Sequence, residues 1–257
     1  MRIPTPVHVK APKGSIAESA LISDDRDRVE DLSHMLTNCR LASDSRGFLI
    51  YTGKYKGLTV TLASHGIGGP SCAILVEEII MLGAKRIVMF GTAAPLVPEI
   101  NLGDYVVATE GRHPAGGLYE GYGAQDTVKT PDAALTKRLV ETFRGRGLKV
   151  HTGSVYASDT YWAEDKDFAR KRREEGNIAV EMESATLFML GEIRHVATAS
   201  VFIASNSVVG KAYIPKEQIE SESREGAAAI FEALNAGARH KYTKSGNKGK
   251  QMVPVPK

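Results

Sequence analysis

The chain has 257 residues, of which 42% are hydrophobic and 25% are charged, a composition that is ordinary for a globular protein with a large core. No apolar stretch reaches the roughly 18 residues of a membrane span, and the polar N-terminus lacks the pattern of a signal peptide, so we expect a cytoplasmic protein with no membrane partner. Cys39 and Cys72 lie far apart and have no metal-like spacing, so we expect neither a disulfide framework nor a metal site.

Strands and helices alternate along the chain. Strands are predicted at residues 20–22, 48–55, 59–64, 86–90, 105–108, 150–156 and 196–204, and Lys56-Gly57 is the turn of a hairpin between the second and third. Helices are predicted to begin at Pro70, at Thr130-Pro131 and at about Pro215. The alternation predicts a single α/β domain without an internal linker.

The formal net charge of +3 comes from the C-terminal end of the chain. Residues 239–257 hold six basic side chains and no acidic one, whereas the rest of the chain has 27 basic and 30 acidic residues. Their glycines and prolines, with few apolar residues, are typical of a disordered tail. We therefore expect a domain at 1–238 and a basic tail at 239–257. The tail has no nucleic-acid-binding motif, so a nucleic acid partner is not expected.

Two carboxylates follow an apolar run near residue 180, in Val180-Glu181-Met182-Glu183. An apolar run that ends in acids before a helix indicates a buried strand at its carboxyl edge, where open α/β sheets bind ligands. The structural alternative is that the acids serve only the start of the helix, whose dipole favours negative charge.

Glycine-rich turns follow two of the predicted strands, at 65–70 and at 91–94. Such turns let backbone amides approach an anion, although glycines in this position also serve geometry alone. Neither turn matches the dinucleotide fingerprint or the Walker loop.

These segments, in this order, resemble the nucleoside phosphorylase family of purine and uridine phosphorylases. The resemblance covers about residues 6–235, and it rests on Pro6-Val7-His8, Asp25 with Arg28, Ser45-Arg46-Gly47-Phe48, Tyr51-Thr52-Gly53, Ser64 to Ser71, Gly91-Thr92, Ile100 to Asp104, Ser158-Asp159 and Val180 to Glu183. Within the family, 5′-methylthioadenosine phosphorylases and hexameric purine nucleoside phosphorylases are the most similar, since the stretch 161–165 lacks the uracil-binding Gln and Arg of uridine phosphorylase. The resemblance implies a central mixed β-sheet flanked by helices.

The resemblance also implies roles for the acids and their neighbours. Glu183 would bind the ribose hydroxyls, Met182 would lie beneath the sugar, and Glu181 would be the looser partner. The base would face Val180 and stack on Tyr161.

A second subunit is part of the same expectation. His8 would reach the 5′ end of the sugar from a neighbouring subunit, which requires a homo-oligomer, and by resemblance a hexamer built as a trimer of dimers. The substrates would be a purine nucleoside or 5′-methylthioadenosine with phosphate as co-substrate, without a cofactor or a metal.

The expected phosphate site departs from the family pattern at two positions. Arg28, Arg46 and Thr92 match phosphate-binding residues, whereas Asp24 stands in place of a glycine and Met89 in place of a strand-end arginine. A missing guanidinium removes a bidentate phosphate contact, and an added carboxylate repels the anion.

The expected base site departs as well, because Asn206 stands where adenine-cleaving relatives have an aspartic acid. An amide cannot donate a net proton to a leaving base, but it can hydrogen-bond a 6-oxopurine such as that of inosine or guanosine. The alternative is that Asn206 records a loss of activity.

Three functions therefore stay open. The first is a phosphorylase in which Arg26 or Arg86 substitutes for the missing arginine. The second is a hydrolytic nucleosidase in which Asp24 or Asp25 orients water as a general base. The third is a non-catalytic nucleoside-binding paralogue. In all three functions, Glu183 binds the ribose of a nucleoside.

Overall fold

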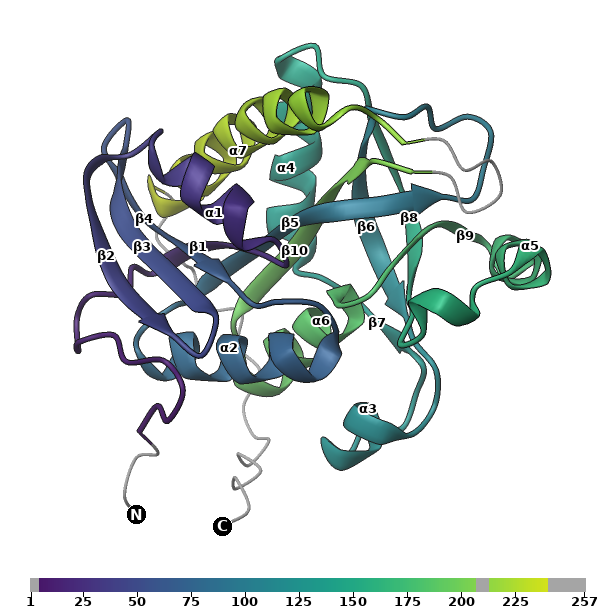
Figure 1. The fold of residues 1–257 in the computed structure, drawn as a ribbon, viewed down its shortest axis with the longest axis horizontal. Helices are drawn as coiled ribbons and strands as arrows, with labels where there is room; N and C mark the ends of the chain where they lie inside the picture. Colours follow the sequence, from purple (N-terminus) through teal and green to yellow (C-terminus); the bar gives the residue numbers. More distant parts are fainter. Residues whose placement is uncertain (1–4, 207–212, 240–257) are drawn as a thin grey trace.

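The computed structural model describes residues 5–206 and 213–239, and these residues form one α/β unit around a central sheet (Figure 1). The sheet is ten-stranded and mixed, with β1 to β6 and β8 to β10 in the order β10-β6-β8-β9-β5-β1-β4-β3-β2 and β7 beside β6. The strands are β1 Ser19–Ser23, β2 Thr37–Ser45, β3 Phe48–Tyr55, β4 Leu58–Ser64, β5 Arg86–Pro95, β6 Tyr105–Arg112, β7 Val128–Lys129, β8 Val150–Ala157, β9 Asn177–Glu181 and β10 Ala197–Ala204.

Part of the sheet closes on itself. Strand β10 pairs with β6 and also with β5, so that β5, β9, β8, β6 and β10 form a ring. The other strands extend from β5 as an open sheet that ends at β2. The expected central mixed sheet is confirmed.

Helices cover both faces of this sheet (Figure 1). Helices α2 (Gly69–Met81) and α6 (Ser184–Arg194) pack on one face, in a core that contains Leu75, Ile79 and Phe188. Helices α1 (Arg26–Ser33), α4 (Ala133–Gly145) and α7 (Lys216–Arg239) enclose a second core on the other face. Two shorter helices, α3 (Gly117–Gly121) and α5 (Lys166–Glu174), and a 3₁₀ turn at Tyr161–Ala163 lie in the connections.

The predicted elements agree with the structure, with differences at their ends. The hairpin between β3 and β4 turns at Lys56 and Gly57, whose φ values of 45° and 88° are both positive, as a two-residue hairpin turn requires. Strand β5 continues five residues beyond the predicted end at Phe90, because β10 and β9 pair with its last residues. We did not predict α1, β2, α3, α5 or β7.

The structure bears on the expected tail and on the expected absence of a membrane span. The expected basic tail lies outside the described residues, except for Arg239 at the end of α7. Among the described residues, no helix combines the length and apolar character needed to span a membrane.

The parallel strands place the functional segments at one edge. Strands β1, β4, β5 and β10 all run in the same direction, with Ser23 paired to Ser64 and Ile203 paired to Thr92. The segments after β1, β4 and β10 therefore meet beside Thr92 at the carboxyl edge of the sheet, where α/β proteins bind ligands.

Candidate functional site

A cavity of about 680 Å³ opens at this carboxyl edge. Its walls come from the segment after β1, from β5, from the segment after β10, and from the first half of α7. The structure thus brings together six residues that the sequence singled out, namely Asp24, Asp25, Arg26, Arg28, Thr92 and Asn206. A volume of this size suits a ligand of nucleoside size.

Arg28 is the buried cation of this cavity, and the chain itself occupies its guanidinium. Arg28 is 8% exposed, and its Nη1 donates to Ser23 Oγ at 2.8 Å and to Asp24 Oδ1 at 3.1 Å. Its Nε donates to Ser223 Oγ at 3.3 Å, and its Nη2 lies 3.8 Å from the Asp25 carboxylate. Asp24 therefore holds the place on the guanidinium that an anionic ligand would take.

The nearby cations do not replace the missing arginine. Arg26 forms a bidentate pair with Asp44, with both N–O distances at 2.8 Å. Arg86 lies at the amino end of β5, where it donates to Ser19 Oγ and pairs with Glu18. The hypothesis that Arg86 substitutes at the anion end is wrong, because it lies at the opposite end of the strand from Thr92.

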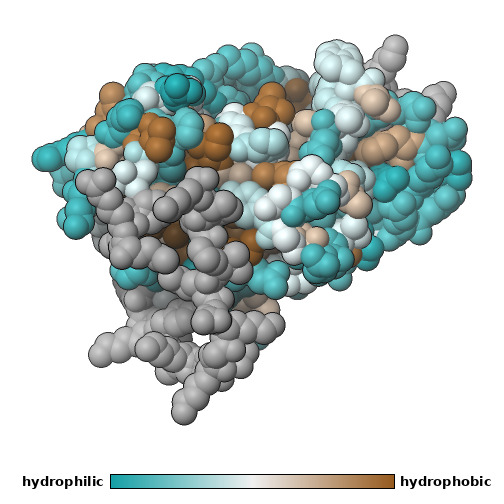
Figure 2. Space-filling model, turned by 90° about the horizontal axis from the view of Figure 1, so that it is seen from below, coloured by the Kyte–Doolittle hydropathy of each residue, from teal (hydrophilic) through white to brown (hydrophobic). Residues whose placement is uncertain are grey.

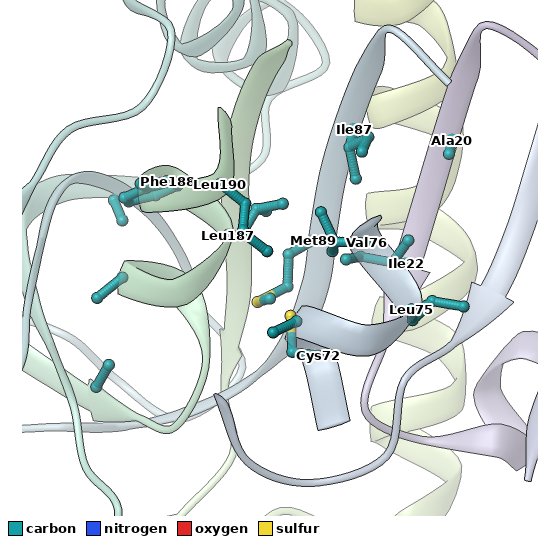
Figure 3. Packing of buried hydrophobic residues seen from close by; sticks show 14 of the residues in the cluster. Ala20, Ile22, Cys72, Leu75, Val76, Ile87, Met89, Leu187, Phe188 and Leu190 are labelled. Carbon is teal, nitrogen blue, oxygen red and sulfur yellow. The ribbon is translucent and has the colours of Figure 1, made fainter. Parts of the chain in front are cut away.

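Met89 lies inside the core instead of at the end of a strand. It is 1% exposed, and it is paired with Ile22 and Ser200 in the middle of β5. Figure 3 shows its side chain beside Cys72 and Leu187. The expectation of a strand end here was wrong, since β5 continues to Pro95. No positive charge is supplied from position 89.

Glu181 closes the turn between β9 and α6. Its Oε2 accepts hydrogen bonds from the backbone amides of Glu183 at 2.7 Å and Ser184 at 2.8 Å, and its Oε1 accepts from Ser184 Oγ at 2.5 Å. Burial raises its pKa to about 7, against the lowering effect of these bonds. Glu181 therefore stabilises the start of α6. This is the role that the structural alternative gave to both acids.

Glu183 is buried, and a backbone amide of a neighbouring loop donates a hydrogen bond to it. It is 6% exposed, and its Oε1 accepts from the Gly68 amide at 2.5 Å, in the glycine-rich turn before α2. Burial raises its pKa well above the usual value, and the like charges of Glu181 and Asp24 raise it further. A carboxylate that the fold keeps in such surroundings is a candidate ligand group. Met182, between the two acids, is half-buried.

The other end of the cavity carries amide and aromatic groups. Asn206 Oδ1 accepts from Ser205 Oγ at 3.0 Å, which leaves the Asn206 NH₂ group as a donor. Tyr213 lines the cavity, and a hydrogen bond with Tyr213 is the largest cause of the raised pKa of Tyr161. Val180 is buried in β9, paired with Ala94. The expected base-binding residues Asn206 and Tyr161 are therefore linked through Tyr213.

Several expected site residues do not line this cavity in their own chain, namely His8, Arg46, Tyr161, Val180, Glu181, Met182 and Glu183. His8 Nδ1 lies 2.7 Å from Glu78 Oε1, and the backbone amides of Val7, His8 and Val9 all donate to the same carboxylate. Arg46 lies exposed in the turn between β2 and β3. The expected roles of His8 and Arg46 in a neighbouring subunit stay predictions.

The sequence interpretation gave no role to several residues of the site. Ser223 comes from α7, 195 positions from Arg28, and no local pattern marks it. Tyr213 likewise carries no motif. His65 was visible only as part of a glycine-rich turn, but its place after β4, next to β1, brings it near Asp24 and Arg28, whose charges both act on its pKa.

Comparisons with known proteins identify the family of this chain. A family model described as the phosphorylase superfamily matches residues 18–236. A purine nucleoside phosphorylase of the DeoD type from Alkaliphilus metalliredigens is 30% identical over 205 residues, which are 79% of this chain and 88% of that protein. A guanosine phosphorylase from Halorubrum lacusprofundi is 27% identical over 202 residues, 79% of this chain and 83% of that protein.

A solved structure shows the same fold. The crystal structure of uridine phosphorylase from Vibrio fischeri ES114 has a TM-score of 0.78 and 24% sequence identity, and the match covers 90% of this chain and 98% of that one. The family match spans most of the chain and includes every element that lines the cavity. The chain therefore belongs to the phosphorylase superfamily.

Proposed function

We propose that this protein cleaves the N-glycosidic bond of a 6-oxopurine nucleoside, such as inosine or guanosine. The observation that carries the proposal is the buried Glu183 carboxylate, which accepts from the Gly68 amide next to the cavity-lining Ile67, together with the Asn206 amide that lines the same cavity. An ionised carboxylate is a strong acceptor for the two ribose hydroxyls, and an amide donor suits a 6-oxopurine better than an adenine that must be protonated. Similarity to a protein named guanosine phosphorylase supports the same base class.

The acceptor of the ribosyl group has two candidates. Both curated relatives are named phosphorylases, which supports phosphate, with Arg28, Arg46 and Thr92 as its binding residues and without a cofactor. The pairing of Arg28 with Asp24 favours water instead. Cytoplasmic action and 5′-methylthioadenosine as a substrate stay predictions from the sequence.

A homo-oligomer, and by resemblance a hexamer, is part of the proposal. Arg46 is exposed away from its own cavity, and Val7, Leu41 and Ile74 are large hydrophobic side chains that are also exposed. Figure 2 shows hydrophobic patches among hydrophilic residues on the face seen from below. Exposed apolar patches are typical of association surfaces.

The function is tested by measuring the products from inosine, guanosine, adenosine, uridine and methylthioadenosine, each with and without phosphate. We expect release of hypoxanthine and guanine to exceed release of adenine and uracil. Binding of nucleosides without release of any base would show a non-catalytic nucleoside-binding protein. Absence of binding for every nucleoside would contradict the proposed function.

Asn206→Asp is expected to shift the preference towards adenosine. A carboxylic acid at this position can protonate a leaving adenine, which the amide cannot do. Because hydrogen bonds to charged groups contribute about 1.5–3 kcal/mol, the adenosine-to-inosine ratio of kcat/KM should rise roughly tenfold or more. Asn206→Ala is the control, and it should lower both rates without the shift. An unchanged ratio in Asn206→Asp would place the base elsewhere.

Nucleoside affinity is expected to rise with increasing pH. The pKa of Glu183 is raised first by burial and then by Glu181 and Asp24, so part of the protein holds a protonated, weaker acceptor at lower pH. Titration calorimetry with inosine at several pH values measures this trend. Glu181→Gln removes one like charge, so its profile should move to lower pH. An affinity independent of pH would contradict ribose binding by Glu183.

A further inference from the structure

Three side chains meet where β1 and β4 end, and none of the expected site roles accounts for them together. Asp24 follows β1, His65 follows β4, and Arg28 from α1 donates to Asp24 Oδ1 at 3.1 Å. The His65 amide donates to the Ser23 carbonyl at 2.8 Å, which fixes the two strand ends side by side. Asp24 packs so tightly on β5 that a Cβ on Gly91 would lie 3.2 Å from its Oδ1.

The Arg28 guanidinium, which would bind a phosphate dianion, is already surrounded by oxygen atoms of the protein. Each guanidinium nitrogen of Arg28 already faces an oxygen of Ser23, Asp24, Asp25 or Ser223. Among the described residues that line the cavity, five are acidic and three are basic, namely Asp24, Asp25, Asp27, Asp31 and Glu220 against Arg26, Arg28 and Lys216. A neutral acceptor avoids the repulsion that these carboxylates exert on an anion.

His65 presents a buried acceptor without a donor. Its ring is 0% exposed, and Nδ1 lies 2.6 Å from the Gly66 carbonyl oxygen. A carbonyl only accepts, so Nδ1 carries the proton and the lone pair of the neutral ring is on Nε2. Burial lowers the pKa of His65, which favours this neutral form. Within the described part of the chain, no donor reaches Nε2. A buried acceptor of this kind calls for a small O–H donor.

We propose that Asp24 and His65 hold the water molecule that attacks the sugar, so that the protein is a hydrolytic nucleosidase. The water would donate one hydrogen to the Asp24 carboxylate and the other to His65 Nε2, which directs an oxygen lone pair at C1′. Arg28 is a positioning residue that aims the Asp24 carboxylate. The inference rests on the proposed cleavage of a nucleoside, and it identifies water as the acceptor of the ribosyl group.

The atoms of this reaction balance with water as the second substrate. The water oxygen forms a bond to C1′ while the bond from C1′ to the purine nitrogen breaks, and the bonding electron pair leaves with the base. One water proton passes to Asp24 and then to solvent, and the purine takes up one proton from solvent. The products are free ribose and free base. Glu183 accepts a hydrogen bond from the Gly68 amide, in the same turn that carries His65, so the proposal places the C1′ of a ribose on Glu183 beside this water.

The test measures inosine cleavage by the full chain in ¹⁸O-labelled water, with and without phosphate, and inosine binding in parallel. We expect ribose that carries one ¹⁸O atom, formed at the same rate in both buffers. Ribose 1-phosphate formed only with phosphate would overturn the acceptor and keep the proposed function. Binding without cleavage in either buffer would overturn the acceptor too, whereas absence of binding would overturn the proposed function itself.

Variants separate the two side chains. Asp24→Asn should lower kcat at least a hundredfold without weakening inosine binding, and Asp24→Gly should make cleavage respond to phosphate because it removes the carboxylate from Arg28 Nη1. His65→Asn should lower kcat roughly tenfold or more, while His65→Gln, whose amide oxygen can lie near the place of Nε2, should recover part of the loss. His195→Asn, at an exposed position, is the matched control. A His65→Asn variant with the kcat of the unaltered protein would overturn the role of His65.

Discussion

Glu183→Gln is expected to abolish tight nucleoside binding while the fold persists. An ionised carboxylate contributes about 1.5–3 kcal/mol for each hydrogen bond to a ligand hydroxyl, so loss of one such bond weakens binding roughly 10- to 150-fold. The same change removes a buried group whose pKa is raised by burial and by two like charges, which is a cost to the folded state. We therefore expect the variant to be as stable as the unaltered protein or more stable, a pattern typical of functional residues.

Calorimetry with inosine and thermal unfolding together check this expectation. Glu181→Gln is the matched control, because it makes the same chemical change two positions away. The control should keep its nucleoside affinity near neutral pH to within a few-fold. An affinity in Glu183→Gln equal to that of the control would remove Glu183 from the ribose site.

Glu181→Ala is expected to have the largest effect on stability. It leaves the amides of Glu183 and Ser184 and the Ser184 hydroxyl without their acceptor in a buried turn. An unsatisfied buried group costs about 1–3 kcal/mol, so we expect a total loss of about 3 kcal/mol or more. For a domain of this size that corresponds to a fall in Tm of roughly 6–12 °C. Differential scanning calorimetry measures it.

Glu181→Gln distinguishes the hydrogen bonds from the charge. Its amide oxygen can accept from both backbone amides, so most of the stability should return. Because the folded-state pKa of Glu181 is about 7 and the reference value is 4.5, the folded chain holds an extra proton between these values. The free energy of unfolding of the unaltered protein, relative to Glu181→Gln, should therefore increase as the pH falls from about 7 to 4.5. A relative stability that increases with pH would contradict the burial of Glu181.

Local patterns predicted the elements that carry the site. Apolar runs gave β1, β3, β4, β5, β6, β8 and β10, and the shared direction of β1, β4, β5 and β10 explains why the segments with Asp24, Thr92 and Asn206 meet. They did not give β2, because an edge strand that is exposed along most of its length shows no alternation of apolar and polar residues. Helix α1 was missed because its eight residues are mostly charged and its amphipathic pattern is short.

The state of the site residues could not be predicted from the sequence. Arg28 matched a phosphate-binding arginine, yet its availability depends on Ser223, which the fold brings from α7. Met89 was placed at a strand end because Gly91 interrupts the apolar run, whereas pairing with β9 and β10 carries the strand further. The unpartnered Nε2 of His65 is set by tertiary contacts alone, since only the fold decides which donors reach it.

A crystal structure of the protein with a non-cleavable inosine analogue tests the central claim most directly. The account predicts that the ribose hydroxyls lie within hydrogen-bond distance of the Glu183 carboxylate, that the purine faces the Asn206 amide, and that a water molecule lies between Asp24 and His65 Nε2 near C1′. An analogue bound outside this cavity, or with its ribose turned away from Glu183, would contradict the account.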